Sequence, residues 1–274
     1  MLSDMTRFLA PTVPALVLAA CGPLSYDGEL ANSPDTGLSG CTVSSCNDTV
    51  LSGVVAKIEG SEGQDLSIRF YTLTDNENGT VTYRDGARTA TMNVVGIGQF
   101  EGTNSAFAFS PTLTYTGVSA GAFGSDEAVI GMIGFQTDAS VIPTSGEATY
   151  YGDSTVTTYN SGSGAGDSTL IVDFGAGTAD LYANLTDGDV LTSFNEVQSL
   201  NMQIDGYSFT GDEVVLLLDS SPVDITGANS QGAGAGIFNG VVDIYGNPVE
   251  YGAVAILSGD SDKVLLLSEG EVAY

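Results

Sequence analysis

Hydrophobic and polar residues alternate over many short segments of the chain. In residues 67–73, Ile68 and Phe70 fall on one side of an extended backbone, while Arg69 and Tyr71 fall on the other. Residues 178–185 show the same period of two. Successive side chains of a β-strand point to opposite faces, so this pattern predicts strands with one buried face. No window keeps a helical period over three turns, which predicts an all-β chain.

The predicted strands form two series. The first covers residues 50–58, 66–73, 80–84, 89–95, 106–116 and 128–136. The second covers residues 147–151, 154–159, 168–174, 178–185, 198–204, 213–218, 235–242, 248–257 and 263–267. A link that contains Pro143 separates the two series. The best position for a helix, a short one, is near residues 119–123 or 125–129.

The second series is the more regular one. Glycine-rich or Asp-Gly turns lie between its strands, as in an antiparallel meander of hairpins. About eight such strands favour a closed barrel, because closure removes the exposed sheet edges. We therefore expect an eight-stranded antiparallel β-barrel over residues 141–274, preceded by a smaller β-rich, handle-like domain over residues 49–140.

The N-terminus has the pattern of an export signal. Arg7 precedes an apolar stretch of 13 residues, 8–20, which is too short to span a bilayer and typical of a signal peptide. The stretch ends in Leu-Ala-Ala-Cys at residues 18–21, which resembles the lipobox of bacterial lipoproteins. That resemblance implies that residues 1–20 are removed and that Cys21 carries the lipid; a cleaved signal with a coincidental cysteine is the alternative.

The resemblance also bears on location. Position 22 is Gly rather than Asp, which by the sorting rule of enteric-type lipoproteins implies the outer membrane, with the lipid on Cys21 as anchor. Residues 21–48 are rich in Gly, Ser, Pro and Asp and are predicted to be a flexible tether. Within it, Cys41 and Cys46 are spaced to close a small loop in an oxidising compartment. We predict a disulfide between them; free thiols are the alternative, and two thiols alone make a poor zinc site.

The charge and composition of the chain exclude several classes of function. The chain has 34 Asp or Glu, six Lys or Arg and no His, for a formal net charge of −28. Such a charge repels a polyanion, so we expect no nucleic-acid partner. The lack of histidine removes every mechanism that needs an imidazole base or ligand. Hydrophobic residues reach 42%, enough for a sizeable core.

No catalytic or metal-binding residues are assigned. Gly-Asp-Ser occurs at residues 152–154 and 166–168, in predicted hairpin turns, but a serine nucleophile of that kind relies on a histidine base. Asp35-Thr36-Gly37 occurs once, in the tether, whereas a paired-carboxylate mechanism needs two such aspartates. The acidic pairs in residues 187–189 and 260–262 do not continue into a calcium loop. We expect no metal, no cofactor and no enzymatic activity.

Five Gly/aromatic motifs of the second series resemble those of transferrin-binding protein B-like surface lipoproteins, in the same order along the chain. They lie at residues 146–152, 170–178, 209–211, 234–240 and 250–254. Ala253 replaces the family's usual second glycine after Glu250, and the usual closing Gly-Ala-Phe-Gly run is missing. The resemblance implies a single barrel with a handle domain. It does not imply transferrin as the ligand, because the transferrin receptors of that family carry two lobes.

The expected function is that of a non-enzymatic binding protein for a protein or a small nutrient or metal carrier. The alternative is a structural or adhesin-like envelope lipoprotein without a solute ligand. Within the barrel, Tyr150, Phe174, Phe209 and Phe238 are predicted to fill the interior. Four tyrosines are plausible interface residues, although strand propensity explains them equally well: Tyr151, Tyr159, Tyr182 and Tyr207. No ligand-binding residue is assigned.

Overall fold

The computed structural model describes residues 46–59, 65–76, 78–86, 88–123, 127–227 and 229–274. The predicted signal peptide, Cys21, Cys41 and most of the tether lie outside these residues. The described part is built from strands, with two short 3-10 turns, η1 (Ala139–Val141) and η2 (Asp189–Thr192). It contains no helix long and apolar enough to cross a bilayer. The predicted all-β class is confirmed.

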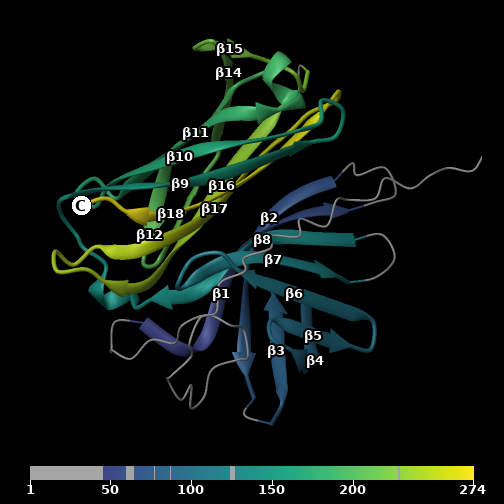
Figure 1. Cartoon of the computed structure of the whole chain (residues 1–274), viewed down its shortest axis with the longest axis vertical. Helices are drawn as coiled ribbons and strands as arrows, with labels where there is room; N and C mark the ends of the chain where they lie inside the picture. The colour runs from purple at the N-terminus through teal and green to yellow at the C-terminus, as the bar shows by residue number, and fades with distance from the viewer. Residues whose placement is uncertain (1–45, 60–64, 77, 87, 124–126, 228) are drawn as a thin grey trace, which may run out of the picture. The chain divides into compact units, whose positions relative to one another are not determined.

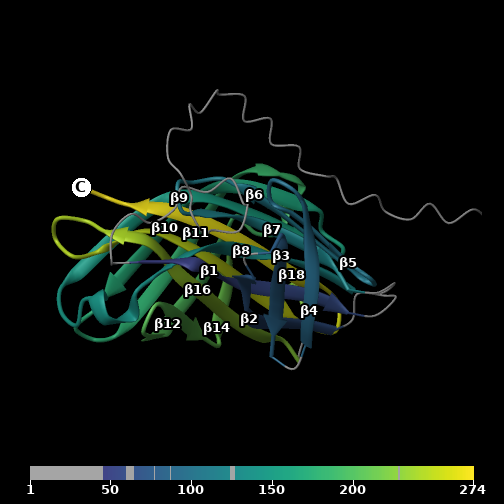
Figure 2. The same cartoon turned by 90° about the horizontal axis from the view of Figure 1, so that it is seen from below.

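The first series of strands closes on itself (Figures 1 and 2). Its members are β1 (Cys46–Glu59), β2 (Asp65–Asp75), β3 (Thr80–Asp85), β4 (Arg88–Gly96), β5 (Gln99–Gly102), β6 (Ser105–Pro111), β7 (Thr116–Ala122) and β8 (Glu127–Thr137). Each strand pairs antiparallel with the next, and β1 pairs with both β2 and β8. We call this closed set the N-terminal ring.

The second series forms the predicted barrel. Its members are β9 (Glu147–Thr158), β10 (Ser163–Asp173), β11 (Thr178–Gly188), β12 (Glu196–Asp205), β13 (Ser208–Gly211), β14 (Glu213–Leu218), β15 (Ser221–Val223), β16 (Gln231–Val242), β17 (Pro248–Ser258) and β18 (Lys263–Val272). The pairing β9–β10–β11–β12–β13–β16–β17–β18–β9 closes an eight-stranded antiparallel barrel. Strand β14 continues β13 along β12, contributes Leu216 to the barrel core, and also pairs with β15.

Aromatic side chains fill the barrel interior. Tyr150, Phe174, Phe209 and Phe238, predicted to do so, are all buried. The Phe238 ring centroid lies 5.0 Å from that of Phe209 and 6.0 Å from that of Phe174. Ala179, Leu181 and Ala183 of β11 face the same core, as the alternation along this strand predicts. The interior is therefore a packed core rather than a ligand cavity.

Three barrel strands are buried on both faces, which alternation alone does not predict. The middle of β17 is an unbroken run of buried residues, and β16 and β18 contain similar runs. Their outer face packs on the N-terminal ring through one cluster: Val54, Met132, Ala235, Val254 and Leu267. Strand β8 also pairs with β16, at Gln136 and Asn239. All the described strands belong to one compact unit.

Several sequence-based predictions of individual elements are wrong. The segment predicted as one strand, 106–116, is divided between β6 and the start of β7, and the short strand β5 was not foreseen. The best position for a short helix, near residues 119–123 or 125–129, is occupied by strand at residues 119–122 of β7 and 127–129 of β8. The Gly-Asp-Ser triplets lie inside β9 and β10 rather than in turns. The two strands predicted at residues 147–151 and 154–159 are therefore a single strand, β9.

Candidate functional site

The lipidation and disulfide predictions concern residues outside the described part of the chain. Both the backbone and the side chains of Cys21 and Cys41 lie outside the described residues. The backbone of Cys46 opens β1 and lies opposite Thr137 of β8, but its side chain is not among those described. Lipidation of Cys21 and a disulfide between Cys41 and Cys46 therefore stay predictions.

The two Gly-Asp-Ser triplets face each other across β9 and β10, where Asp153 lies opposite Asp167. Their serines are buried. Ser154 Oγ donates to the Gly166 carbonyl at 3.2 Å, and Ser168 Oγ lies 2.9 Å from the Tyr251 hydroxyl inside the barrel. These hydroxyls satisfy buried polar groups, as interior hydroxyls must, and they are not exposed for attack on a substrate.

The acidic loops have local structural partners. Asp262 is buried and accepts hydrogen bonds from the backbone N–H of Asn160 at 3.0 Å and from Ser161 Oγ at 2.8 Å, which ties the β17–β18 turn to the β9–β10 turn. Among the described residues, no group of three or more His, Cys, Asp or Glu is arranged to hold a metal ion.

Two glutamates lie at the contact between the barrel and the N-terminal ring. Glu250 is 2% exposed and accepts hydrogen bonds from the backbone N–H groups of Thr114 (3.0 Å) and Tyr115 (2.9 Å). Glu269 accepts a hydrogen bond from Thr112 Oγ1. Burial raises the pKa of each carboxyl to about 7. Because each acid is explained by its contact with residues 112–115, we assign these groups to the interface rather than to a ligand site.

The turn between β16 and β17, residues 243–247, projects two large apolar side chains into solvent, and we call it the hairpin tip. Ile244 is 89% exposed and Tyr245 is 74% exposed. Asp243 holds the backbone beneath them, since its Oδ1 accepts from the N–H of Tyr245 at 2.7 Å and of Asn247 at 2.8 Å. Gly246 supplies the positive φ of 89° that closes the turn. The tip is thus preorganised rather than loose.

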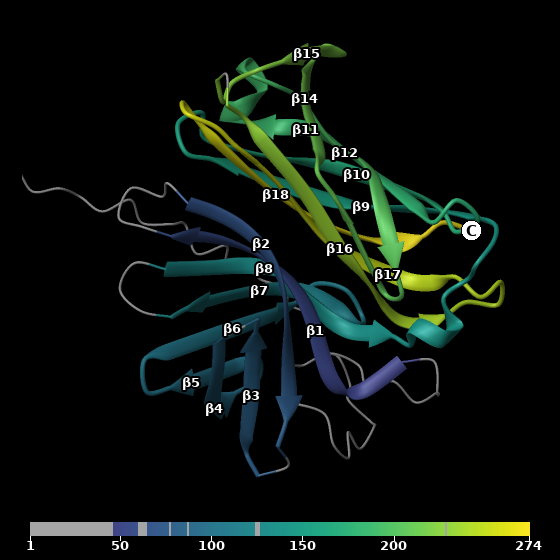
Figure 3. The same ribbon diagram turned by 180° about the vertical axis from the view of Figure 1, so that it is seen from behind.

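The chain terminus lies at the same end of the barrel as the hairpin tip (Figure 3). Tyr274 is exposed, and the N–H of its neighbour Ala273 donates to the carbonyl of Thr149 at 2.8 Å. Burial, together with the charges of Asp243 and Tyr274, raises the pKa of Tyr150. Of the four tyrosines weighed as interface residues, Tyr151 and Tyr159 are exposed, and Tyr182 and Tyr207 are half-buried. Tyr159 lies in the β9–β10 turn, at the opposite end of the barrel from the tip.

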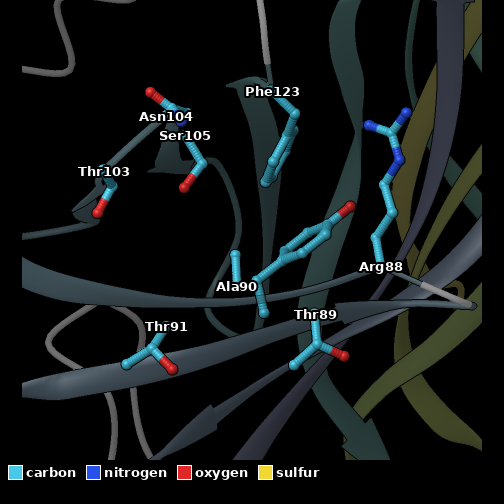
Figure 4. Close-up of a pocket in the computed structure, with 9 residues that line it drawn as sticks. Arg88, Thr89, Ala90, Thr91, Thr103, Asn104, Ser105 and Phe123 are labelled. Carbon is cyan, nitrogen blue, oxygen red and sulfur yellow. The ribbon is translucent and has the colours of Figure 1, made fainter.

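A second feature is an open pocket of about 520 Å³ on the N-terminal ring, beside β4 and the β5–β6 turn (Figure 4). We call it the β4 pocket. Hydroxyl and amide side chains, one arginine and two aromatic rings line it: Tyr83, Arg88, Thr89, Ala90, Thr91, Thr103, Asn104, Ser105 and Phe123. The centroid of the Phe123 side-chain ring lies 4.7 Å from that of Tyr83. Tyr83 belongs to the hydrophobic core of the N-terminal ring.

Neither the hairpin tip nor the β4 pocket was predicted from the sequence. The hairpin tip has a signal in Asp243-Ile244-Tyr245-Gly246, a turn sequence that carries two large apolar residues. The β4 pocket has a weaker one, because four of the six Lys and Arg residues fall between positions 57 and 88, where six acids accompany them.

Comparison with known proteins gives matches among solved structures alone. No family model and no curated protein matches the sequence. A transferrin binding protein B of Haemophilus parasuis matches with a TM-score of 0.46 and 17% identity over 81% of this chain and 45% of that one. Isotype 1 transferrin binding protein B of serogroup B Neisseria meningitidis matches with a TM-score of 0.49 and 13% identity, over 83% of this chain and 44% of that one.

HpuA of Kingella denitrificans, solved in complex with human haemoglobin, gives a TM-score of 0.43 and 11% identity over 86% of this chain and 90% of that one. The chain thus spans less than half the length of the two transferrin binding proteins and most of the length of HpuA. Transferrin binding protein B is also the protein whose family the five motifs of the sequence resemble. Similarity at this identity assigns neither a ligand nor a partner to this chain.

Proposed function

We propose that this protein is a non-enzymatic binding protein, held on the outer membrane by a lipid on Cys21, and that it binds a protein or a nutrient-carrier ligand through the hairpin tip. The exposed, preorganised pair Ile244 and Tyr245 is the observation that carries the proposal. Aromatic anchors of this kind dominate the energetics of protein interfaces.

The packed barrel core supports an external binding surface. Tyr150, Phe209 and Phe238 occupy the space in which a carrier of the lipocalin type would hold its ligand. We therefore expect the barrel to contact its partner through the turns between its strands. A turn whose backbone is already fixed loses little conformational entropy on binding, which favours affinity.

The negative charge of the protein favours a basic partner. A net charge of −28 attracts basic proteins and repels acidic ones. The Asp243 carboxylate lies directly under the exposed pair. The expected partner has an apolar pocket for Tyr245 and a basic rim around it.

Binding to whole cells that produce the full chain tests this proposal. Fluorescent transferrin, haemoglobin and a panel of basic serum proteins serve as probes, and bound fluorescence is measured as the probe is titrated. At least one probe is expected to bind. Tyr245→Ser is then expected to weaken its binding by about tenfold or more, as loss of an interface anchor does.

Tyr159→Ser is the matched control, because it removes a similarly exposed tyrosine (63%) at the opposite end of the same barrel. It should leave binding unchanged. Equal losses in the two variants would show that the tip is not the contact. Failure of every probe to bind would favour the alternative role, a structural or adhesin-like envelope lipoprotein.

A further inference from the structure

The N-terminal ring holds a lysine and an aspartate in its interior, where neither side chain reaches solvent. Lys57 of β1 and Asp85 of β3 form an ion pair, and both side chains are 0% exposed. A lysine is almost never fully buried, because its long side chain can usually carry the ammonium group to solvent. Neither residue belongs to the hairpin tip or lines the β4 pocket, so this pair needs an explanation of its own.

The pair joins two strands that a third strand separates. Strand β2 lies between β1 and β3 and pairs with both, so that Ser67 of β2 lies opposite Lys57 and Tyr71 lies opposite Asp85. On the other side of β1, Val129 of β8 lies opposite Lys57. Tyr71 and Val129 both belong to the core of the N-terminal ring. Because directly paired residues share a face of the sheet, the side chains of Lys57 and Asp85 also point into the ring, where they meet.

Aromatic side chains surround this part of the interior, which makes charged groups costly there. Tyr83 occupies the buried position two residues before Asp85 on β3, and its ring stacks on that of Tyr71 at a centroid distance of 5.4 Å. In the described part of the chain, neither carboxyl oxygen of Asp85 accepts a hydrogen bond. The contact with Lys57 is therefore the interaction that offsets the burial of this carboxylate. An ion pair without further hydrogen bonds compensates poorly for the loss of water around both charges.

The same surroundings favour a reaction between the two groups. Transfer of a proton from the Lys57 ammonium to the Asp85 carboxylate removes both charges and leaves an amine beside a carboxylic acid. The Nζ lone pair can then attack Cγ of Asp85 and form a C–N bond. The nitrogen gives up a proton, and the hydroxyl of the acid takes it and leaves as water when its C–O bond breaks. The product is an amide between Nζ and Cγ, and the reaction consumes no oxidant, reductant or other reactant.

We infer that Lys57 and Asp85 are a site of spontaneous covalent modification, at which an intramolecular isopeptide bond cross-links β1 to β3. Folding holds the amine and the carboxyl group in contact, which gives them a high effective concentration. Burial excludes bulk water, and this disfavours hydrolysis of the amide once it has formed. The amide carries no charge, so it is less costly to bury than the ion pair that it replaces.

The cross-link strengthens the strand that follows the predicted tether. Strand β1 is the first described strand, so a load between a membrane anchor and the folded part of the chain acts on β1 before it reaches the other strands. A covalent bond from residue 57 to residue 85 carries part of that load to β3, and it also restricts the unfolded chain by closing a loop. This consequence rests on the proposed anchor, whereas the bond itself does not.

Peptide mass spectrometry of the purified full chain, denatured and digested with trypsin, tests the inference. Trypsin cuts after lysine and arginine, so an unlinked chain is cut after Lys57 and releases residues 58–69 and residues 85–88 as separate peptides. In a linked chain Lys57 resists cleavage, and residues 85–88 stay attached to its side chain through a bond that survives denaturation and reduction. The expected result, in most of the purified protein, is a branched peptide that is lighter by one water molecule than its two parts together.

Lys57→Arg and Asp85→Ala each remove one reacting group, so both variants should give no branched peptide. Lys263→Arg is the matched control, because it removes the other lysine of the chain and should leave the branched peptide in place. The inference is overturned if the unchanged protein is cut after Lys57 and releases residues 85–88, or if fragmentation maps the link to a different pair of residues. None of these outcomes depends on the hairpin tip, so they leave the proposed binding function untouched.

Discussion

Phe238 shows at the scale of single residues how the barrel is held together. Its ring contacts those of Tyr150, Phe174 and Phe209, each from a different strand or strand end. The pattern of glycine and aromatic residues in the sequence predicts that these rings are buried, because large aromatic side chains at the inward positions fill a small barrel. The same pattern gives no information about Ile244 and Tyr245, whose exposure follows from the turn that carries them.

Phe238→Ala is expected to lower the free energy of unfolding by about 3–5 kcal/mol, because it leaves a cavity among the three neighbouring rings. Chemical denaturation followed by tyrosine fluorescence measures the loss. Tyr159→Ala serves as control and should change stability by no more than about 0.5 kcal/mol, since its side chain is exposed. Equal, small losses in both variants would contradict a packed barrel interior.

At the scale of elements, contacts between segments far apart in the sequence decide what local patterns leave open. Glu250 of β17 is an acid whose neighbours in the sequence give no sign of what covers it. The turn at residues 112–115 covers it and supplies two backbone N–H donors. Burial outweighs these hydrogen bonds, and the pKa rises from 4.5 to about 7. Burial also raises the pKa of Glu269 of β18 to about 7.

The raised pKa of Glu250 predicts a protein that loses stability as the pH rises. A carboxyl with a higher pKa in the folded state binds its proton more tightly there than in the unfolded chain. Its contribution is complete below the ordinary value of 4.5 and is lost as the pH rises through about 7. A shift of this size corresponds to about 3 kcal/mol.

Denaturant unfolding of the wild type and of Glu250→Gln, between about pH 5 and about pH 8, measures this effect. The wild type should be more stable at the lower pH, partly because its net negative charge falls there. Glu250→Gln should be more stable than the wild type at pH 8, since the amide stays neutral, and its pH dependence should be weaker. Parallel curves for the two proteins would show that Glu250 is ionised without cost in the folded state.

At the scale of the whole molecule, the described strands form a closed ring and a closed barrel whose contact buries both faces of β16–β18. This contact leaves the hairpin tip and the β4 pocket accessible on separate parts of the compact unit. Access to either feature from outside the cell depends on how the N-terminus is attached.

Cys21→Ala tests the proposed anchor. Protease shaving of intact cells should digest the wild-type protein, because a lipid on Cys21 holds it at the outer surface, whereas the unlipidated variant should be released or left inside the envelope. Immunoblotting of cells and medium measures both. If the wild type is digested only after the outer membrane is opened, the protein faces the periplasm and the surface-receptor proposal is wrong.

The sequence by itself determined the all-β class, the positions of most strands, the inward faces of strands such as β11, and the exclusion of histidine-based chemistry. These properties depend on residue type and on alternation between neighbours, which are local. Only the tertiary structure decided the closure of the N-terminal ring, the double burial of β17, the pKa of Glu250, and the positions of the hairpin tip and the β4 pocket. Each of these depends on contacts such as that between residues 114 and 250, and a local pattern carries no information about which distant segment will cover a given face.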